Sequence, residues 1–199
     1  MTRSFAVTWD YRCPFARNVH EHLLAGLEAG ADWDVRFSAF SLDQAHVEDG
    51  GTPVWEEPER YPGLLANLAG IVVRDGLPES FPAVHRALFA ARHDRALDLR
   101  DRSVVGGVLD AAGVDGAGVL GDVDSGKPLE VLAAEHVDAV DKHDLFGVPT
   151  FIAGAKAAFV RLMNRPGDGA AAVATVDRVL DMLEGWPDLN EFKHTRAGR

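Results

Sequence analysis

Apolar and polar residues at the start of the chain follow the order strand, helix, strand. Residues 5–9 (FAVTW) form a short apolar run rich in aromatic and β-branched side chains, as in a buried strand. From Pro14 onward, apolar residues recur every four positions up to Leu27, which predicts an amphipathic helix ending near Gly30. Residues 33–39 alternate between apolar and polar, the period of a strand. Together these segments predict a βαβ unit.

The middle of the chain reads as helical. Residues 41–62 hold prolines and glycines among acidic residues and predict a loop, after which helical stripes occur around 64–71, 81–88 and 104–109. A further helix is expected over about residues 125–142. The stretch 116–121 (GAGVLG) has the spacing of a dinucleotide-binding loop but follows no strand, and Pro128 stands where a phosphate-binding loop needs a hydroxyl. We therefore interpret the glycine-rich stretch as a loop between helices.

The remaining sheet elements come late in the chain. Residues 145–152 (LFGVPTFI) form an apolar strand candidate with a proline near its start, where a missing N–H is tolerated. Residues 157–161 are expected to return as a hairpin partner across Gly154, and a last helix is expected over 169–183. The order βαβ, helices, αββα predicts an α/β fold with residues 1–45 and 145–199 in the sheet domain. Residues 46–144 are then an all-helical insertion that includes the connecting helix.

Composition and charge limit the classes of molecule that the protein is expected to bind. The chain has 199 residues, 47% of them hydrophobic, with a net charge of -11, which disfavours nucleic acid and anionic membranes. No signal peptide or membrane-spanning run is evident, and a single cysteine suits a reducing compartment, so we expect a cytoplasmic protein. No metal site is expected, because the histidine pairs lack a completing ligand set. A small molecule is the expected partner, and a homodimer is left open.

Cys13, the only cysteine, lies between the first strand and the first helix. A helix start offers unpaired N–H groups and the positive end of the helix dipole, so a thiol there ionises more readily. Arg12 and Arg17 flank the sulfur and add to this expectation. Ala16 stands where a two-cysteine motif carries its second sulfur, so the chain cannot close an internal disulfide. The alternative is a small buried apolar residue.

Cys13 and the segment Gly147-Val148-Pro149-Thr150 together resemble the DsbA-like branch of the thioredoxin fold. Within that branch the chain is similar to actinobacterial mycothiol-dependent nitroreductases. The likeness rests on three segments: Asp10 to Phe15, Phe146 to Phe151, and the tail Trp186 to Arg196. Family members with that activity carry Cys-Pro-x-Cys, whereas this chain has Ala16 at the last position.

The resemblance implies a thioredoxin-like sheet with a helical insertion and Cys13 as the catalytic residue. It also implies that Pro149 is cis and faces Cys13, and that the Val148 backbone meets the bound thiol or peptide. The neighbours Tyr11, Arg12, Pro14 and Phe15 are expected to contact substrate or thiol. Arg161 and Arg165 are candidates to pair with a substrate carboxylate. Solvated surface arginines are the alternative.

These residues predict a single-cysteine thiol oxidoreductase. Its co-substrate is a low-molecular-weight thiol, mycothiol or glutathione, and no tightly bound cofactor is expected. The expected substrate is a disulfide or an electrophile. Two alternatives stay open: an enzyme resembling kappa-class glutathione transferases and 2-hydroxychromene-2-carboxylate isomerases, and a thioredoxin-fold binding protein without catalysis.

Overall fold

The computed structural model describes residues 2–191 and 193–194, so part of the expected tail motif, residues 192 and 195–196, lies outside the described residues. The chain divides into two compact units. The sheet unit holds residues 1–9, 13–38 and 142–199, and the helical unit holds residues 10–12 and 39–141. The division therefore falls at 38/39 and 141/142 where the sequence suggested 45/46 and 144/145, and it assigns the three residues before Cys13 to the helical unit.

The sheet unit contains strands β1 (Arg3–Trp9), β2 (Trp33–Ala39), β3 (Thr150–Ala153) and β4 (Lys156–Phe159), in the spatial order β2-β1-β3-β4. Helix α1 (Pro14–Glu28) connects β1 to β2, as the sequence predicted. Strand β3 pairs antiparallel with β1, placing Phe151 opposite Val7, and antiparallel with β4 across a turn at Gly154. Gly154 has φ +60°, a backbone conformation that glycine adopts without steric cost.

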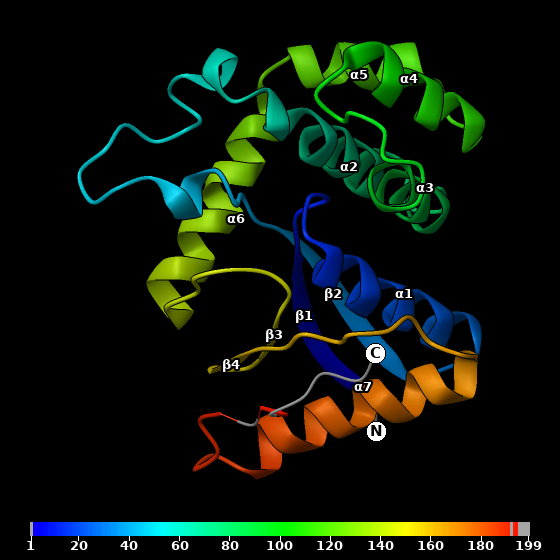
Figure 1. Ribbon diagram of the computed structural model, residues 1–199, viewed down its shortest axis with the longest axis vertical. Helices are drawn as coiled ribbons and strands as arrows, with labels where there is room; N and C mark the ends of the chain where they lie inside the picture. Colours follow the sequence, from blue (N-terminus) through cyan, green and yellow to red (C-terminus); the bar gives the residue numbers. More distant parts are fainter. Residues whose placement is uncertain (1, 192, 195–199) are drawn as a thin grey trace. The chain divides into compact units, whose positions relative to one another are not determined.

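Helices α1 and α7 (Gly169–Gly185) lie alongside each other and share one core with the sheet (Figure 1). Residues alternate along a strand, so Phe5 and Val7 lie on the same face, and Phe151 joins them from β3. The helices contribute the same kind of apolar side chain to this core: Val19, Leu23, Val176 and Leu180. The core therefore fixes α1, the helix that begins directly after Cys13.

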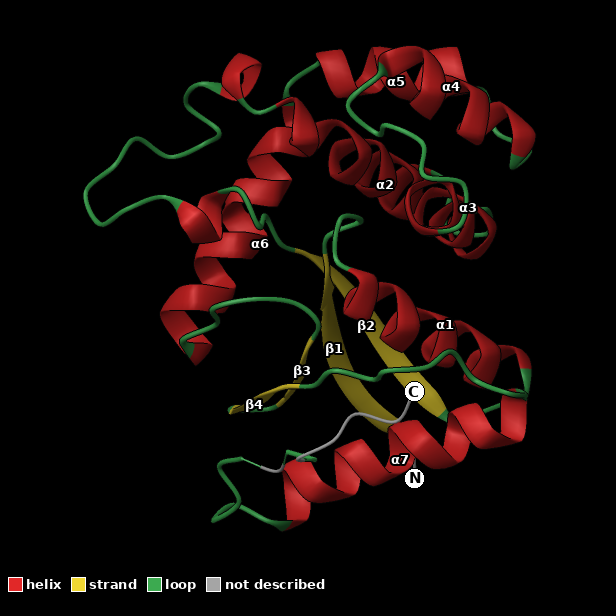
Figure 2. Ribbon diagram, in the orientation of Figure 1, coloured by secondary structure: helices red, strands yellow, loops and turns green. Residues whose placement is uncertain are grey.

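The helical unit consists of short 3-10 turns and helices, drawn in red in Figure 2. Its α-helices are α2 (Leu65–Gly76), α3 (Phe81–His93), α4 (Arg102–Ala111), α5 (Gly116–Asp124) and α6 (Lys127–His143). The expected α/β class, with a small sheet divided in sequence by a helical block, is confirmed.

Helix α5 corrects the sequence interpretation, which placed a loop at residues 116–121. The Asp115 side chain caps this helix by accepting a hydrogen bond from the Gly118 amide at 3.1 Å. Helix α5 also buries apolar residues, among them Val119 and Val123. A Cβ at position 116 would lie 2.5 Å from the Gly106 carbonyl oxygen, so the glycine at this position allows α5 to approach α4 closely. Capping and packing thus outweigh the low helix propensity of the glycines.

Candidate functional site

Cys13 is the N-cap of helix α1, with Pro14 in the first turn. Pro14 is exposed and suits this place because its missing N–H would have no helical partner. The Ala16 amide donates to Cys13 Sγ at 3.4 Å, so the sulfur occupies the position of an N-capping oxygen. This contact and the helix dipole favour negative charge on the sulfur.

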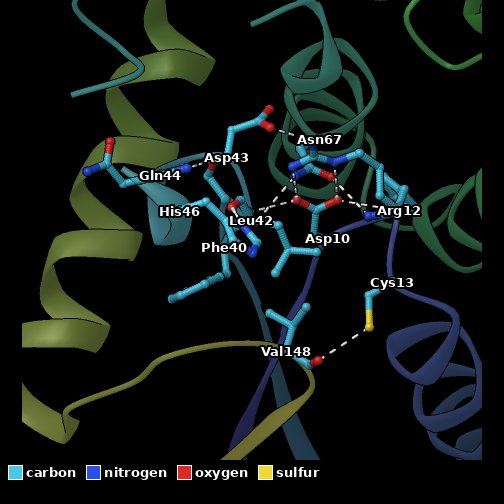
Figure 3. Close-up of polar contacts among 12 residues, drawn as sticks. Asp10, Arg12, Cys13, Phe40, Leu42, Asp43, Gln44, His46, Asn67 and Val148 are labelled. Atoms are coloured by element: carbon cyan, nitrogen blue, oxygen red, sulfur yellow. Dashed lines mark hydrogen bonds and ion pairs between the residues drawn. The ribbon is translucent and has the colours of Figure 1, made fainter. Parts of the chain in front are cut away.

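The Cys13 thiol also donates to the Val148 carbonyl oxygen, with Sγ and O 3.3 Å apart (Figure 3). The next peptide bond, Val148–Pro149, is cis. Hydrogen bonds fix this segment: the Thr150 hydroxyl donates to the Gly147 carbonyl and the Thr150 amide to the Thr8 hydroxyl, both at 2.9 Å. The fold therefore holds the sulfur and the backbone before Pro149 in direct contact.

The cysteine side of the sheet unit carries aromatic rings and one arginine. The Arg161 guanidinium lies 5.3 Å from the ring centre of Phe15 and 5.7 Å from that of Phe159. Phe146 is 73% exposed, and its ring centre lies 5.2 Å from that of Phe159. Phe15 follows Cys13 by two positions and Phe146 precedes Val148 by two, so apolar surface flanks both halves of the site.

Two of the expected arginines are engaged with a carboxylate. Arg17 pairs with Glu21 at 3.1 Å, and Arg165 pairs with the same carboxylate. Arg17, expected beside the thiol, and Arg165, a candidate to pair with a substrate carboxylate, therefore both have a carboxylate partner within the chain. Arg161 is exposed and stacks on aromatic rings instead.

Within the helical unit, the segment Asp10–Arg12 is held by buried polar contacts. The Asp10 carboxylate accepts hydrogen bonds from the Arg12 amide at 2.9 Å, from its guanidinium at 2.9 and 3.1 Å, and from the Leu42 amide at 3.0 Å (Figure 3). Arg12 also reaches Asp43 at 2.6 Å. Burial lowers the pKa of Arg12, but its bonds to Asp10 and Asp43 outweigh this, so the pKa is raised above its ordinary value. Arg12 is thus compensated within its own unit.

Tyr11 is buried, and each of its polar groups has a partner in the helical unit. Its amide donates to Asn67 at 3.2 Å, its carbonyl accepts from His93 Nε2 at 2.9 Å, and its hydroxyl pairs with His85 Nδ1 at 2.7 Å. Burial raises the pKa of Tyr11 well above its usual value, so the phenol stays protonated. These contacts fix the backbone that leads into Cys13.

His20 is a buried residue of helix α1, in the interior of the sheet unit. Its Nε2 donates to the Thr8 carbonyl at 3.1 Å, and its ring meets Trp9 edge to face with centres 6.3 Å apart. Burial lowers the pKa of His20 to about 4. The imidazole is therefore neutral near pH 7 and serves packing.

Sequence reasoning pointed to Cys13 and to the segment at Pro149, which the structure brings into contact, but it missed the groups that hold residues 10–12. Asn67 and His85 interrupt the apolar stripes of α2 and α3, and both are fully buried or nearly so. A polar residue on an apolar helix face is the available signal, because burial requires it to find a hydrogen-bond partner. No spacing rule identifies that partner as Tyr11. Across residues 2–191 and 193–194, no group of three metal-ligating side chains could hold an ion.

No family model matches the sequence, and no curated protein matches it significantly. Solved structures do resemble it. A probable DsbA oxidoreductase from Streptomyces coelicolor is 14% identical with a TM-score of 0.62, and the match covers 98% of this chain and 95% of that one. The cytosolic disulfide reductase DsbM from Pseudomonas aeruginosa, solved with GSH, is 15% identical with a TM-score of 0.62, covering 89% and 98%.

A 2-hydroxychromene-2-carboxylate isomerase is also similar, at 15% identity and a TM-score of 0.61, covering 90% of this chain and 97% of that one. Identities this low show the fold alone. The chain thus has the DsbA-like thioredoxin fold, as the sequence resemblance implied. In the part of the chain that the structure describes, no helix is long and apolar enough to cross a bilayer.

Proposed function

We propose that the protein is a single-cysteine thiol oxidoreductase that acts through Cys13. The observation that carries this proposal is the position of the sulfur, which caps α1 and contacts the Val148 carbonyl next to Pro149. The similar solved structures include oxidoreductases of the same fold. The fold leaves other chemistry open, and the thiol geometry is what supports this choice.

The proposed reaction has two exchange steps. The Cys13 thiolate attacks one sulfur of a small disulfide, forming a mixed disulfide and releasing the other half as a thiolate that takes up a proton. A low-molecular-weight thiol, ionised, then attacks the bound half, forming a new small disulfide and restoring the Cys13 thiolate. The second thiol must come from outside because position 16 is alanine. The exchange balances without a further oxidant or reductant.

The surroundings of Cys13 support a small substrate with an apolar part. The Ala16 amide can stabilise the thiolate, and the Val148 carbonyl accepts the proton of the resting thiol. Phe15 and Arg161 offer a ring face and a cation at 5.3 Å from each other. We propose mycothiol or glutathione as the reducing thiol, cytoplasmic action in line with the single cysteine, and a monomer or homodimer as the acting species.

Mass spectrometry tests this proposal directly. The native protein, incubated with oxidised glutathione or oxidised mycothiol, should gain one adduct per chain, and peptide mapping should place it on Cys13. The alkylation rate should reach its plateau at lower pH in the native protein than in the same protein unfolded in urea, because only the native helix start stabilises the thiolate. An absence of adduct from about pH 6 to about pH 9 contradicts the proposal.

Ala16→Cys provides a matched gain of function. The new thiol lies one helical turn from Cys13, where the alanine is buried and its amide already contacts the sulfur. We expect the glutathione adduct to be replaced by an intramolecular disulfide and free glutathione. Persistence of the adduct in this variant shows that position 16 cannot resolve it.

A second candidate is an enzyme that binds a thiol cofactor without redox exchange, supported by the similarity to the isomerase. In that case Cys13 holds or activates the bound thiol, and Cys13→Ser keeps substantial turnover because a hydroxyl can still donate to the cofactor sulfur. The oxidoreductase proposal expects loss of exchange in the same variant. Loss of both activities with an unreactive native thiol favours a binding protein.

A further inference from the structure

The helical unit contains a cavity of about 620 Å³, and all of its lining residues belong to that unit. This volume lies in the range of small-molecule sites, about 300 to 1,000 Å³. The walls come from residues 11–12, from Asp43, from residues 60–66 and from residues 92–100. Four arginines and two aspartates line it, a net charge of +2 in a chain whose total is -11.

Arg12 and Asp43 form a fixed part of the wall. Arg12 is bound to both Asp10 and Asp43, so its charge is already compensated (Figure 3). A Cβ on Gly63 would lie 2.9 Å from Arg12 Nη1 and 3.1 Å from an Asp43 oxygen. Glycine therefore lets the backbone of residues 61–63 lie directly against the ion pair.

Arg100 is compensated as well, by Asp98, which precedes it by two positions in the chain. Its guanidinium donates to both Asp98 oxygens, with distances of 2.8 to 3.1 Å. The hydrogen bonds from Arg100 lower the pKa of Asp98 to about 2, so this carboxylate stays charged at neutral pH.

Arg92 and Arg60 are the two arginines of the cavity wall that do not pair with a carboxylate of that wall. Among residues 2–191 and 193–194, no carboxylate lies within ion-pair distance of Arg92, which acts on Asp98 only through space. Arg60 pairs with Glu57, which is not part of the cavity wall, and its own side chain is 65% exposed. Exposed pairs of this kind contribute about 0 to 1 kcal/mol, so an anion in the cavity can compete for Arg60.

We propose that this cavity binds a small organic dianion, with Arg92 and Arg60 meeting its two negative charges. Arginine recognises carboxylate and phosphate alike through paired N–H donors. The apolar body of the ligand would lie against Tyr61 and Leu99, which also line the cavity. The proposal goes beyond the thiol chemistry and does not require Cys13 to react.

Titration calorimetry on the full chain tests it with three probes: phenyl phosphate, phthalate, and benzyl alcohol as the neutral analogue. We expect the two dianions to bind and benzyl alcohol not to bind. The dianion that binds with the higher affinity identifies phosphate or carboxylate as the preferred group. Raising the salt concentration should weaken the binding. Equal affinity for benzyl alcohol, or no binding of either dianion at millimolar concentration, overturns the proposal.

Charge-matched variants locate the site. Arg92→Gln and Arg60→Gln should each lower the affinity for the preferred dianion about tenfold, because each removes one charge-assisted hydrogen bond. Arg95→Gln removes the same charge from an exposed neighbour outside the wall and should change the affinity less than about twofold. A loss in Arg95→Gln equal to that in Arg92→Gln contradicts the assignment. Cys13→Ser should bind the dianion as the wild type does, so the thiol proposal and this one can fail separately.

Discussion

Two buried histidines should make the protein lose stability in mild acid. Burial lowers the pKa of His20 and of His136 to about 4, against 6.5 for an unperturbed histidine. The unfolded chain therefore binds more protons than the native one between about pH 6.5 and pH 4, and the free energy of unfolding falls as the pH falls through this window. One pKa unit corresponds to about 1.4 kcal/mol, so each histidine should cost about 2 kcal/mol between pH 7 and pH 5.

The assay is urea unfolding, followed by circular dichroism at about pH 7 and about pH 5. His20→Gln can keep a donor for the Thr8 carbonyl but carries no titratable group. We expect the wild type to lose about 4 kcal/mol between the two pH values and the variant about 2 kcal/mol. Any packing cost of the substitution lowers the variant's free energy of unfolding equally at both pH values. Only the change in that free energy between the two pH values is therefore compared with the wild type. A variant with the same loss as the wild type refutes the assignment to His20.

Two further predictions concern the contacts of Tyr11. Tyr11→Phe removes the 2.7 Å hydrogen bond to His85 from the interior and should lower the free energy of unfolding by about 1 to 2 kcal/mol, read from urea midpoints. Gly70→Ala would place a Cβ 2.6 Å from the Tyr11 hydroxyl oxygen and should cost about 1 to 3 kcal/mol. Its control, Gly107→Ala, has nothing within 4 Å of the new Cβ and should leave α4 unchanged or stabilise it by up to about 1 kcal/mol. Equal destabilisation by both alanines would mean that Tyr11 is not the obstacle.

Much of the fold follows from short-range patterns in the sequence. The four-residue period after Pro14 and the alternation over residues 33–39 give α1 and β2 directly, because each records which face of an element is buried. The hairpin of β3 and β4 follows from an apolar strand and the turn at Gly154. The glycine-rich stretch of α5 escaped this reasoning, since its helix depends on a cap at Asp115 and on close packing against Gly106.

In the candidate site, too, some features follow from the sequence alone and others depend on the tertiary structure. The sequence by itself determined that one sulfur stands at a helix start, with no second sulfur at position 16, because N-capping is a property of adjacent residues. Only the tertiary structure decided that this sulfur meets the Val148 carbonyl, 135 positions away. It also decided that Arg165 is engaged by Glu21 and that Tyr11 is enclosed by Asn67 and His85. Hydrogen bonds and ion pairs act over a few ångströms, so partners far apart in the chain are chosen by the packing of the elements that carry them.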